Sequence, residues 1–248
     1  MTLRRFLAAF LASAALVVSP LAFAVDESAT VALGRGTVLL PVLPGFADPA
    51  TTPPALLDLM SRSMPATNRF VAILPTQDFL DRRAAGENVA MSRYMLVQTV
   101  RAHEQNGVSQ AEFERIKAML RQQSDTMLHD SEKQVQESFD SVAKELGKTN
   151  DDSSLTLKAG AGKSLGVFDE TPNSISMANI QSLTRSDKAG THTLVQAVAM
   201  SIALVGDVPL SVCVYSTYQS PADIDWTKRE VLDWVKRYTV LNADAGTK

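Results

Sequence analysis

The chain has 248 residues, with 24 Lys and Arg against 27 Asp and Glu, a formal net charge of −3 and a single cysteine. This slight acidic excess argues against a nucleic-acid surface, which needs a basic stripe to neutralise phosphates. One cysteine has no internal partner, so a disulfide framework is excluded. The length suits one large domain with a substantial core.

The N-terminal 24 residues have the three parts of a secretory signal peptide. Arg4 and Arg5 give a positive start, residues 6–18 form an apolar run, and small residues stand at both ends of 22–24. The run is about 13 residues long, short of the roughly 20 that a spanning helix needs. We therefore predict cleavage near Val25, a periplasmic or secreted location, and no transmembrane segment in the mature chain. Because only basic charges are removed with the signal, the mature net charge is −5, from 22 basic and 27 acidic residues.

Strands alternate with short helices in the first half of the mature chain. Alternation of apolar residues predicts strands over 31–42, 69–74 and 91–101, the first with a Gly-Arg-Gly interruption. Capping residues and prolines predict short helices over 52–62 and 76–85.

A long helix is predicted to follow. Ser109 and Glu112 form a capping box, which satisfies backbone donors at a helix start. Apolar residues at helical spacing continue it: Phe113, Ile116, Leu120, Val135, Phe139, Val142 and Leu146. The polar stretch 129–134 divides this stripe, so one helix from Ser109 to Leu146 and two shorter helices both remain open.

The second half changes to the period of a β-sheet. Strands are predicted over 154–158, 165–170, 174–183, 193–205 and 210–218. The fourth is apolar on both sides, which is typical of a strand covered on both faces. Residues 206–209 predict a hairpin loop, and Ser220 with Pro221 predicts the start of a closing helix. The apolar side of that helix holds Ile224, Val231, Val235 and Tyr238.

This order predicts an α/β protein of the α+β type, a mostly antiparallel sheet with helices on both faces. The predicted organisation is a signal peptide over 1–24, one domain over 25–241 and a flexible tail over 242–248.

The layout resembles the PsbP-like sandwich. The resemblance rests on the entry at Pro41 to Phe46, the long helix before a meander of strands, the hairpin at Val205 to Pro209 and the closing helix at Ser220. That group includes extrinsic photosystem II subunits, a nuclear Ran-binding release factor and periplasmic DcrB-like proteins of bacteria. The resemblance implies a binding or accessory protein without an active site of its own.

A glycine-rich segment is similar to a phosphate-binding loop. Residues 160–164 read Gly-Ala-Gly-Lys-Ser, but Leu157 stands where the motif needs its first glycine. Residues 165–168 predict a strand, so no helix N-terminus follows to hold a phosphate. We interpret the segment as a flexible turn.

Residues for metal binding or nucleophilic catalysis show no matching pattern. His103, His129 and His192 lie far apart and match no zinc spacing, and there is no Gly-x-Ser-x-Gly elbow. Cys213 lies in an apolar run and is interpreted as a buried strand residue. No catalytic residue, metal or cofactor is predicted.

Two pairs of carboxylates are candidates for acid–base chemistry or cation binding. Asp169 and Glu170 end a strand, but neighbours on a strand point to opposite faces, so they are poorly placed to act together. Asp223 and Asp225 lie in the first turns of the closing helix, where the helix dipole favours acidic residues.

Trp226 is the predicted partner-binding residue. On a helical wheel it lies opposite the apolar stripe of the closing helix, among Arg229, Asp233 and Arg237. An exposed Trp is a common interface anchor. The alternative is that Trp226 packs on the loop at the helix start.

The predicted function is a non-catalytic binding or accessory protein whose partner is another envelope protein. The alternative is an enzyme whose site assembles from separated polar residues such as Asp169, Glu170 and His192. An enzyme would gather titratable groups in a deep pocket, whereas an accessory factor would present an apolar patch. The sequence specifies neither the partner nor the oligomeric state.

Overall fold

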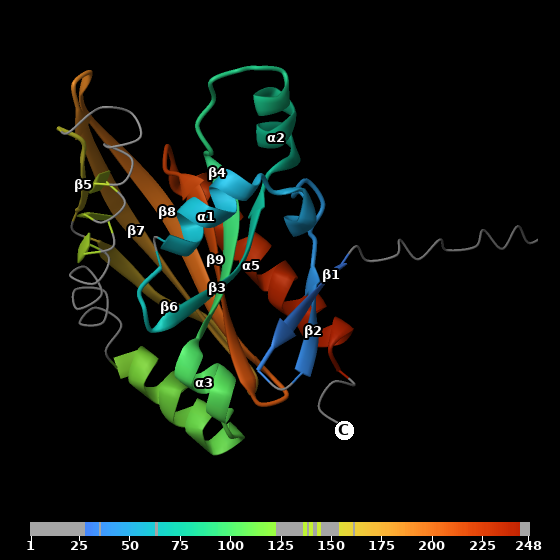
Figure 1. The fold of residues 1–248 in the computed structure, drawn as a ribbon. Helices are drawn as coiled ribbons and strands as arrows, with labels where there is room; N and C mark the ends of the chain where they lie inside the picture. The colour runs from blue at the N-terminus through green and yellow to red at the C-terminus, as the bar shows by residue number, and fades with distance from the viewer. Residues whose placement is uncertain are drawn as a thin grey trace, which may run out of the picture.

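The computed structural model is an α+β fold in which a curled antiparallel sheet carries helices, as the strand and helix patterns predicted (Figure 1). It describes residues 28–34, 36–62, 64–122, 136–137, 139–140, 143–144, 154–160 and 162–243. The predicted signal peptide, over 1–24, lies outside the described residues.

The chain begins with a hairpin that is separate from the main sheet. Strand β1 (Ser28–Leu33) pairs antiparallel with β2 (Gly36–Pro41), so the single interrupted strand predicted over 31–42 is wrong. The chain reverses at Gly34, which has a φ of 52°. Any side chain at Gly34 would collide with the backbone carbonyl of Glu104. The interruption therefore marks a tight turn that glycine alone can occupy.

The main sheet has seven strands. They are β3 (Asn68–Pro75), β4 (Arg93–Val100), β5 (Thr156–Ala159), β6 (Lys163–Thr171), β7 (Ser174–Asp187), β8 (Gly190–Val205) and β9 (Val208–Thr217). The order is β3-β4-β9-β8-β7-β5, and β6 also pairs with β7. All these pairs are antiparallel, which confirms the predicted sheet type.

Two hairpin ends differ from the predicted strand bounds. The β7–β8 ladder continues to Asp187 and Gly190, beyond the predicted ends at 183 and 193, because polar cross-strand pairs such as Ser186 with Thr191 extend it. The β8–β9 turn is also shorter than the predicted loop, since Val205 pairs directly with Val208.

The helices lie on and around the sheet. They are the 3-10 turn η1 (Pro49–Thr51), α1 (Pro54–Arg62), α2 (Gln77–Ala84), α3 (Arg101–Asn106), a helix whose described part is 110–122, and α5 (Pro221–Leu241). Helix α2 has no buried residue and stands away from the sheet (Figure 1). The short helix α3 was not predicted. Residues 129–134 lie outside the described residues, so the continuity of the long helix stays an open prediction.

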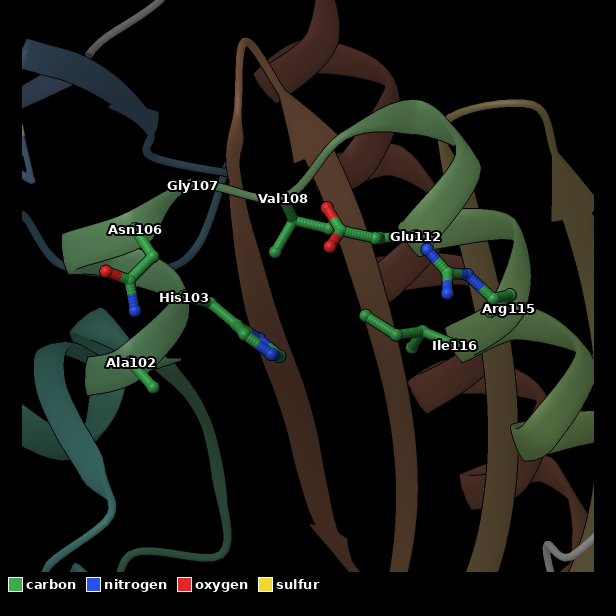
Figure 2. A pocket seen from close by; sticks show the side chains of 8 residues that line it. All are labelled: Ala102, His103, Asn106, Gly107, Val108, Glu112, Arg115 and Ile116. Carbon is green, nitrogen blue, oxygen red and sulfur yellow. The ribbon is translucent and has the colours of Figure 1, made fainter.

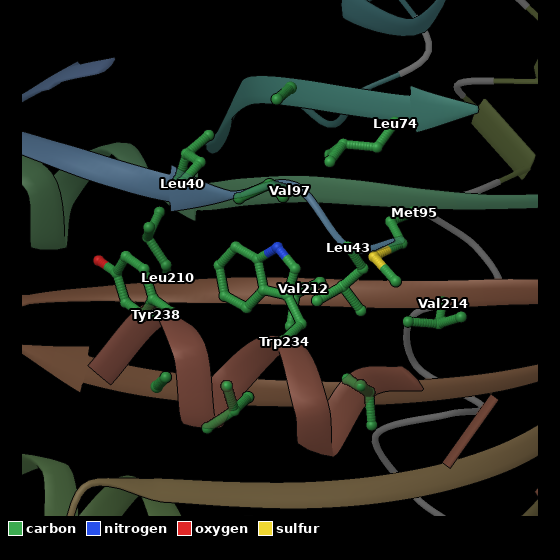
Figure 3. Packing of buried hydrophobic residues seen from close by; sticks show 14 of the residues in the cluster. Leu40, Leu43, Leu74, Met95, Val97, Leu210, Val212, Val214, Trp234 and Tyr238 are labelled. Carbon is green, nitrogen blue, oxygen red and sulfur yellow. The ribbon is translucent and has the colours of Figure 1, made fainter. Parts of the chain in front are cut away.

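Helix α5 packs on one face of the sheet and forms the main core. Its Trp234 and Tyr238 are both 0% exposed and stack with ring centroids 4.9 Å apart. Figure 3 shows them among side chains from the sheet and from β2, including Val212 and Leu40. Full burial of such large side chains contributes roughly 1.5–3 kcal/mol each. We call this side of the sheet the α5 face.

The opposite face is covered by the helix that begins at residue 110. Phe113 packs with Val108 and with Leu204 of β8. Ala199 and Ala203 of the same strand belong to the core on the α5 face. The prediction that this strand is covered on both faces is therefore confirmed.

The end of α5 is fastened to the N-terminal hairpin by one side chain. Asn242 Oδ1 accepts a hydrogen bond from Leu39 N at 2.8 Å, and Asn242 Nδ2 donates to Leu39 O at 2.8 Å. Asn242 is only 4% exposed. Asn242 is therefore fixed in place and does not belong to the flexible tail predicted over 242–248. Residues 244–248 lie outside the described residues.

Replacing Asn242 by Ala should destabilise the protein by about 1–3 kcal/mol, because the Leu39 backbone groups lose both partners. Urea denaturation measures this change. Asn106→Ala is the control, since Asn106 is exposed. Equal stability of the two variants would show that the hairpin is not held by Asn242.

Candidate functional site

The three polar residues of the predicted enzyme alternative do not come together. Asp169 is in register with Ser176, which pairs with Ser201 of β8, whereas His192 lies near the other end of that strand. Nine residues of strand separate positions 192 and 201, or about 30 Å at the rise of a β-strand. The structure thus excludes a shared site for Asp169, Glu170 and His192.

Glu170 is used instead to dock the long helix. Its carboxylate accepts hydrogen bonds from Arg121 at 2.9 and 3.1 Å and lies 3.3 Å from Lys117 Nζ. The Lys117 side chain is 3% exposed, and Nζ also donates to Thr171 O at 2.8 Å. A buried ammonium needs such partners, so this network has a structural role.

The remaining sequence candidates are dispersed as well. Among the described residues, no three His, Cys, Asp or Glu side chains are placed to hold a metal ion. The glycine-rich segment leads into a strand, as predicted, but β6 begins at Lys163, so Lys163 and Ser164 belong to the strand and not to the predicted turn. Cys213 is buried in β9, and burial raises the pKa of its thiol to about 12, which leaves it protonated.

Trp226 lies in a cluster at the start of α5. Its ring stacks on Phe46, with centroids 6.1 Å apart and planes at 22°. The Arg93 guanidinium carbon lies 4.5 Å from the centre of the same ring. Trp226 is partly buried and packs against the main core, so it is not the fully exposed residue that the helical wheel suggested. The alternative of packing near the helix start is closer to what the structure shows.

Arg93 is held in place by the capping residue of α5. Its Nη2 lies 3.3 Å from Asp223 Oδ1, and its Nε donates to Ser216 Oγ at 3.3 Å. Asp223 Oδ2 accepts from Gln219 N at 2.9 Å and Ser220 N at 3.0 Å. These backbone donors, with Arg93, hold the pKa of the Asp223 carboxyl below its usual range. Asp223 lies in the first turn of α5, as predicted, and it both caps the helix and orients the guanidinium beside Trp226.

We call Phe46, Arg93 and Trp226 the tryptophan cluster. Phe46 is buried, whereas the Arg93 side chain is 44% exposed and Trp226 is partly exposed. The cluster therefore presents an aromatic ring and a guanidinium at the surface in fixed positions. Arginine and tryptophan are among the side chains most enriched at the centres of protein interfaces.

A second feature is an open hollow between α3 and the helix that begins at residue 110. Its volume is about 390 Å³, and it is lined by Ala102, His103, Asn106, Gly107, Val108, Glu112, Arg115 and Ile116. Figure 2 shows His103 projecting from α3 toward the side of the hollow formed by Ile116. The hydrogen bond from Val108 N to Asp207 O, at 2.6 Å, ties the connection between the two helices to the β8–β9 turn.

Sequence reasoning missed the hollow and most of the tryptophan cluster. The capping box beside the hollow was predicted and is present, since Ser109 N donates to Glu112 Oε2 at 2.8 Å and Glu112 N donates to Ser109 Oγ at 3.3 Å. The sequence presents His103 only as a possible metal ligand. Phe46 and Arg93 carry no local signal, because each meets Trp226 only through the fold.

These features define an α+β protein with a surface cluster and an open hollow. Comparisons with known proteins do not assign it to a family. No family model and no curated protein matches the chain. A solved structure of a point mutant of protein Mog1 is similar at 12% identity, with a TM-score of 0.36, over 86% of this chain and 94% of that one. The Ran-binding protein Mog1p of Saccharomyces cerevisiae is similar at 11% identity, with a TM-score of 0.29, over 88% and 93%. At these scores neither supports an inference about this chain.

None of the helices in the described residues has both the length and the hydropathy needed to cross a membrane.

Replacing Asp223 by Asn should lower stability at neutral pH by about 1–2 kcal/mol, because the carboxylate caps α5 and pairs with Arg93. The folded pKa of Asp223 is lowered, so its contribution is complete above the ordinary aspartate pKa of about 3.9 and is lost as the pH falls through the folded pKa. Thermal unfolding from pH 7 to pH 3 should show the wild-type and variant curves converging at acid pH. Asp225→Asn, at an exposed position, is the control. A wild-type advantage over D223N that persists undiminished at pH 3 would contradict this assignment.

Proposed function

We propose that this chain is an exported, non-catalytic binding or accessory protein that contacts another protein of the cell envelope through the tryptophan cluster. The export signal predicted from residues 1–24 supports the location. The resemblance of its layout to the PsbP-like sandwich, a group of accessory and binding proteins, is consistent with this role.

The observation that carries the proposal is the fixed geometry around Trp226. Its ring is stacked on Phe46 and covered by Arg93, and Arg93 is in turn paired with Asp223. A ring and a guanidinium that are already ordered lose little conformational freedom when a partner binds. Such a preorganised pair at the surface suits an interface anchor.

The titratable groups of the enzyme alternative have structural roles or lie apart. Glu170 pairs with Lys117 and Arg121. His192 lies near the β7–β8 turn, at the other end of β8 from the residue that is in register with Asp169. A reaction site needs its groups within hydrogen-bond reach of one substrate. The tryptophan cluster is therefore the better basis for a function.

Trp226→Ala should weaken partner binding by about tenfold or more, because an interface Trp contributes about 2 kcal/mol or more. Partners are first identified by crosslinking and mass spectrometry in envelope fractions, and the affinity of each purified partner is then measured by calorimetry. Trp226→Phe keeps an aromatic ring beside Phe46 and Arg93 and should retain part of the affinity.

Lys236→Ala is the matched control, since Lys236 is exposed on the same helix. Thermal unfolding checks that each variant is folded. Wild-type affinity in a folded Trp226→Ala protein would remove the tryptophan cluster from the proposal.

The predicted location has its own test. In cells with two membranes, the protein should be recovered from the periplasmic fraction with an N-terminus near Val25, because the peptidase acts after the small residues at 22–24. Mass spectrometry of the N-terminal peptide measures this. Intact Met1 on protein recovered from the cytosol would contradict export.

A further inference from the structure

The connection between β3 and β4 is much longer than the sheet requires. Pro75 of β3 and Tyr94 of β4 are in antiparallel register. A loop of about two to five residues is enough to close a hairpin beyond such a pair. Here the chain runs from residue 76 to residue 93 and includes α2, and it extends past the ends of both strands (Figure 1). We call residues 77–92 the α2 arm.

The α2 arm contributes no buried side chain to the core. Helix α2 has eight residues and none of them is buried, and every other side chain of the arm is exposed or partly exposed. A helix of this length is not stable alone in water, where about 12–15 residues are needed. Packing on the core therefore does not account for the arm.

Polar contacts within the arm hold it in one shape. Arg82 pairs with Glu87 at 2.7 Å, and Glu87 N donates to Arg82 O at 3.0 Å. Arg83 Nη1 donates to Glu87 O and to Asn88 Oδ1, both at 3.3 Å. These bonds join α2 to the returning chain. An arm that is already ordered in this way loses little conformational freedom when a partner binds it.

Both ends of the arm lead into the tryptophan cluster. Before its first residue, Thr76 forms an antiparallel β-bridge with Phe46. After its last residue comes Arg93, which covers the ring of Trp226. A protein seated on Trp226 and Arg93 would therefore also lie against the base of the arm.

Two sets of side chains decide what the arm can bind. The charged set is nearly balanced, with three acidic and two basic members: Asp78, Asp81, Glu87, Arg82 and Arg83. The apolar set is partly exposed: Phe79, Leu80, Val89 and Met91. A nucleic acid or an anionic membrane surface would need an excess of basic side chains, which the arm lacks. A near-neutral surface with apolar side chains instead suits a segment of a protein.

We propose that the α2 arm is a second contact region for the protein that binds the tryptophan cluster, and that it receives an apolar segment of that protein. This inference rests on the proposed function. Trp226 and Arg93 are the fixed anchor, and Phe79 and Leu80 extend the interface along α2. Long connections that a scaffold does not need commonly carry recognition.

Site-specific crosslinking in envelope fractions tests the contact directly. The photoreactive residue p-benzoylphenylalanine in place of Ala84, which is exposed at the end of α2, should crosslink the same partner that depends on Trp226. The same group in place of Gln105 is the control, since Gln105 is exposed on α3, at the other end of the sheet from the arm (Figure 1). Adducts from position 84 that contain only a second copy of the chain or lipid would overturn the proposal.

Two variants measure what the arm contributes to affinity. Replacing residues 77–92 by Asn-Gly closes a two-residue turn between Thr76 and Arg93, and should leave the protein folded while weakening partner binding by about tenfold or more. Phe79→Ser combined with Leu80→Ser keeps the backbone and should weaken binding by about fivefold or more. The matched control is Met119→Ser with Val240→Ser, two apolar side chains that are exposed elsewhere. Calorimetry with the purified partner gives the affinities, and thermal unfolding checks that each variant is folded.

The outcomes separate this inference from the function on which it rests. If Trp226→Ala loses the partner while the double serine variant and the folded excision variant bind it as the wild type does, the arm is overturned and the proposed function stands. If Trp226→Ala keeps full affinity, the proposed function fails, and the arm fails with it as a second contact region. Should the excision variant not fold, the crosslink at position 84 and the double serine variant decide.

Discussion

The burial of α5 against the sheet is the constraint on which the rest of the structure depends. Trp234 and Tyr238 fill the space between the sheet and the N-terminal hairpin. Neither Trp234 Nε1 nor the Tyr238 hydroxyl has a hydrogen-bond partner among the described residues, a cost of about 1–3 kcal/mol for each group. Burial also raises the pKa of Tyr238, so its hydroxyl stays neutral. The apolar area of the two rings must offset these costs, which requires the hairpin to stay closed over them.

The same helix connects this core to the surface. Asp223 caps the N-terminus of α5 and pairs with Arg93, which covers Trp226. At the other end, Asn242 bonds the backbone of Leu39 in the hairpin. The packing of α5 on the sheet therefore adds to the contacts of Trp226 with Phe46 and Arg93 in holding the tryptophan cluster in place.

On the opposite face of the sheet, polar contacts at the edge help to position the covering helix, in addition to apolar packing. Phe113 provides the buried apolar contact, and Lys117 with Glu170 fastens the helix to the β6–β7 turn. The capping box between Ser109 and Glu112 begins this helix. A local requirement of helix formation thus fixes the position of the Glu112 carboxylate at the edge of the hollow.

Much of the fold could be predicted because its signals are local. The capping box at Ser109 and the closing helix after Ser220 each depend on a few neighbouring residues, and the antiparallel sheet follows from the strand periodicity. The candidate sites could not be predicted in this way. Arg93 and Asp223 are 130 residues apart in sequence yet in contact, and Trp226 packs against Phe46 and Arg93, which lie far from it in the sequence.

The sequence by itself determined the fold class and most helix and strand positions, because hydrophobic period and capping act over short distances. The export signal remains a prediction. Only the tertiary structure decided that Glu170 serves packing, that Asn242 closes the hairpin, and that Glu112 and Arg115 face one hollow. The physical reason is that burial and pairing depend on segments that meet only after folding. The hydrogen-bond partner of Asn242 in the hairpin and the ion-pair partners of Glu170 on the long helix lie far from them in the sequence.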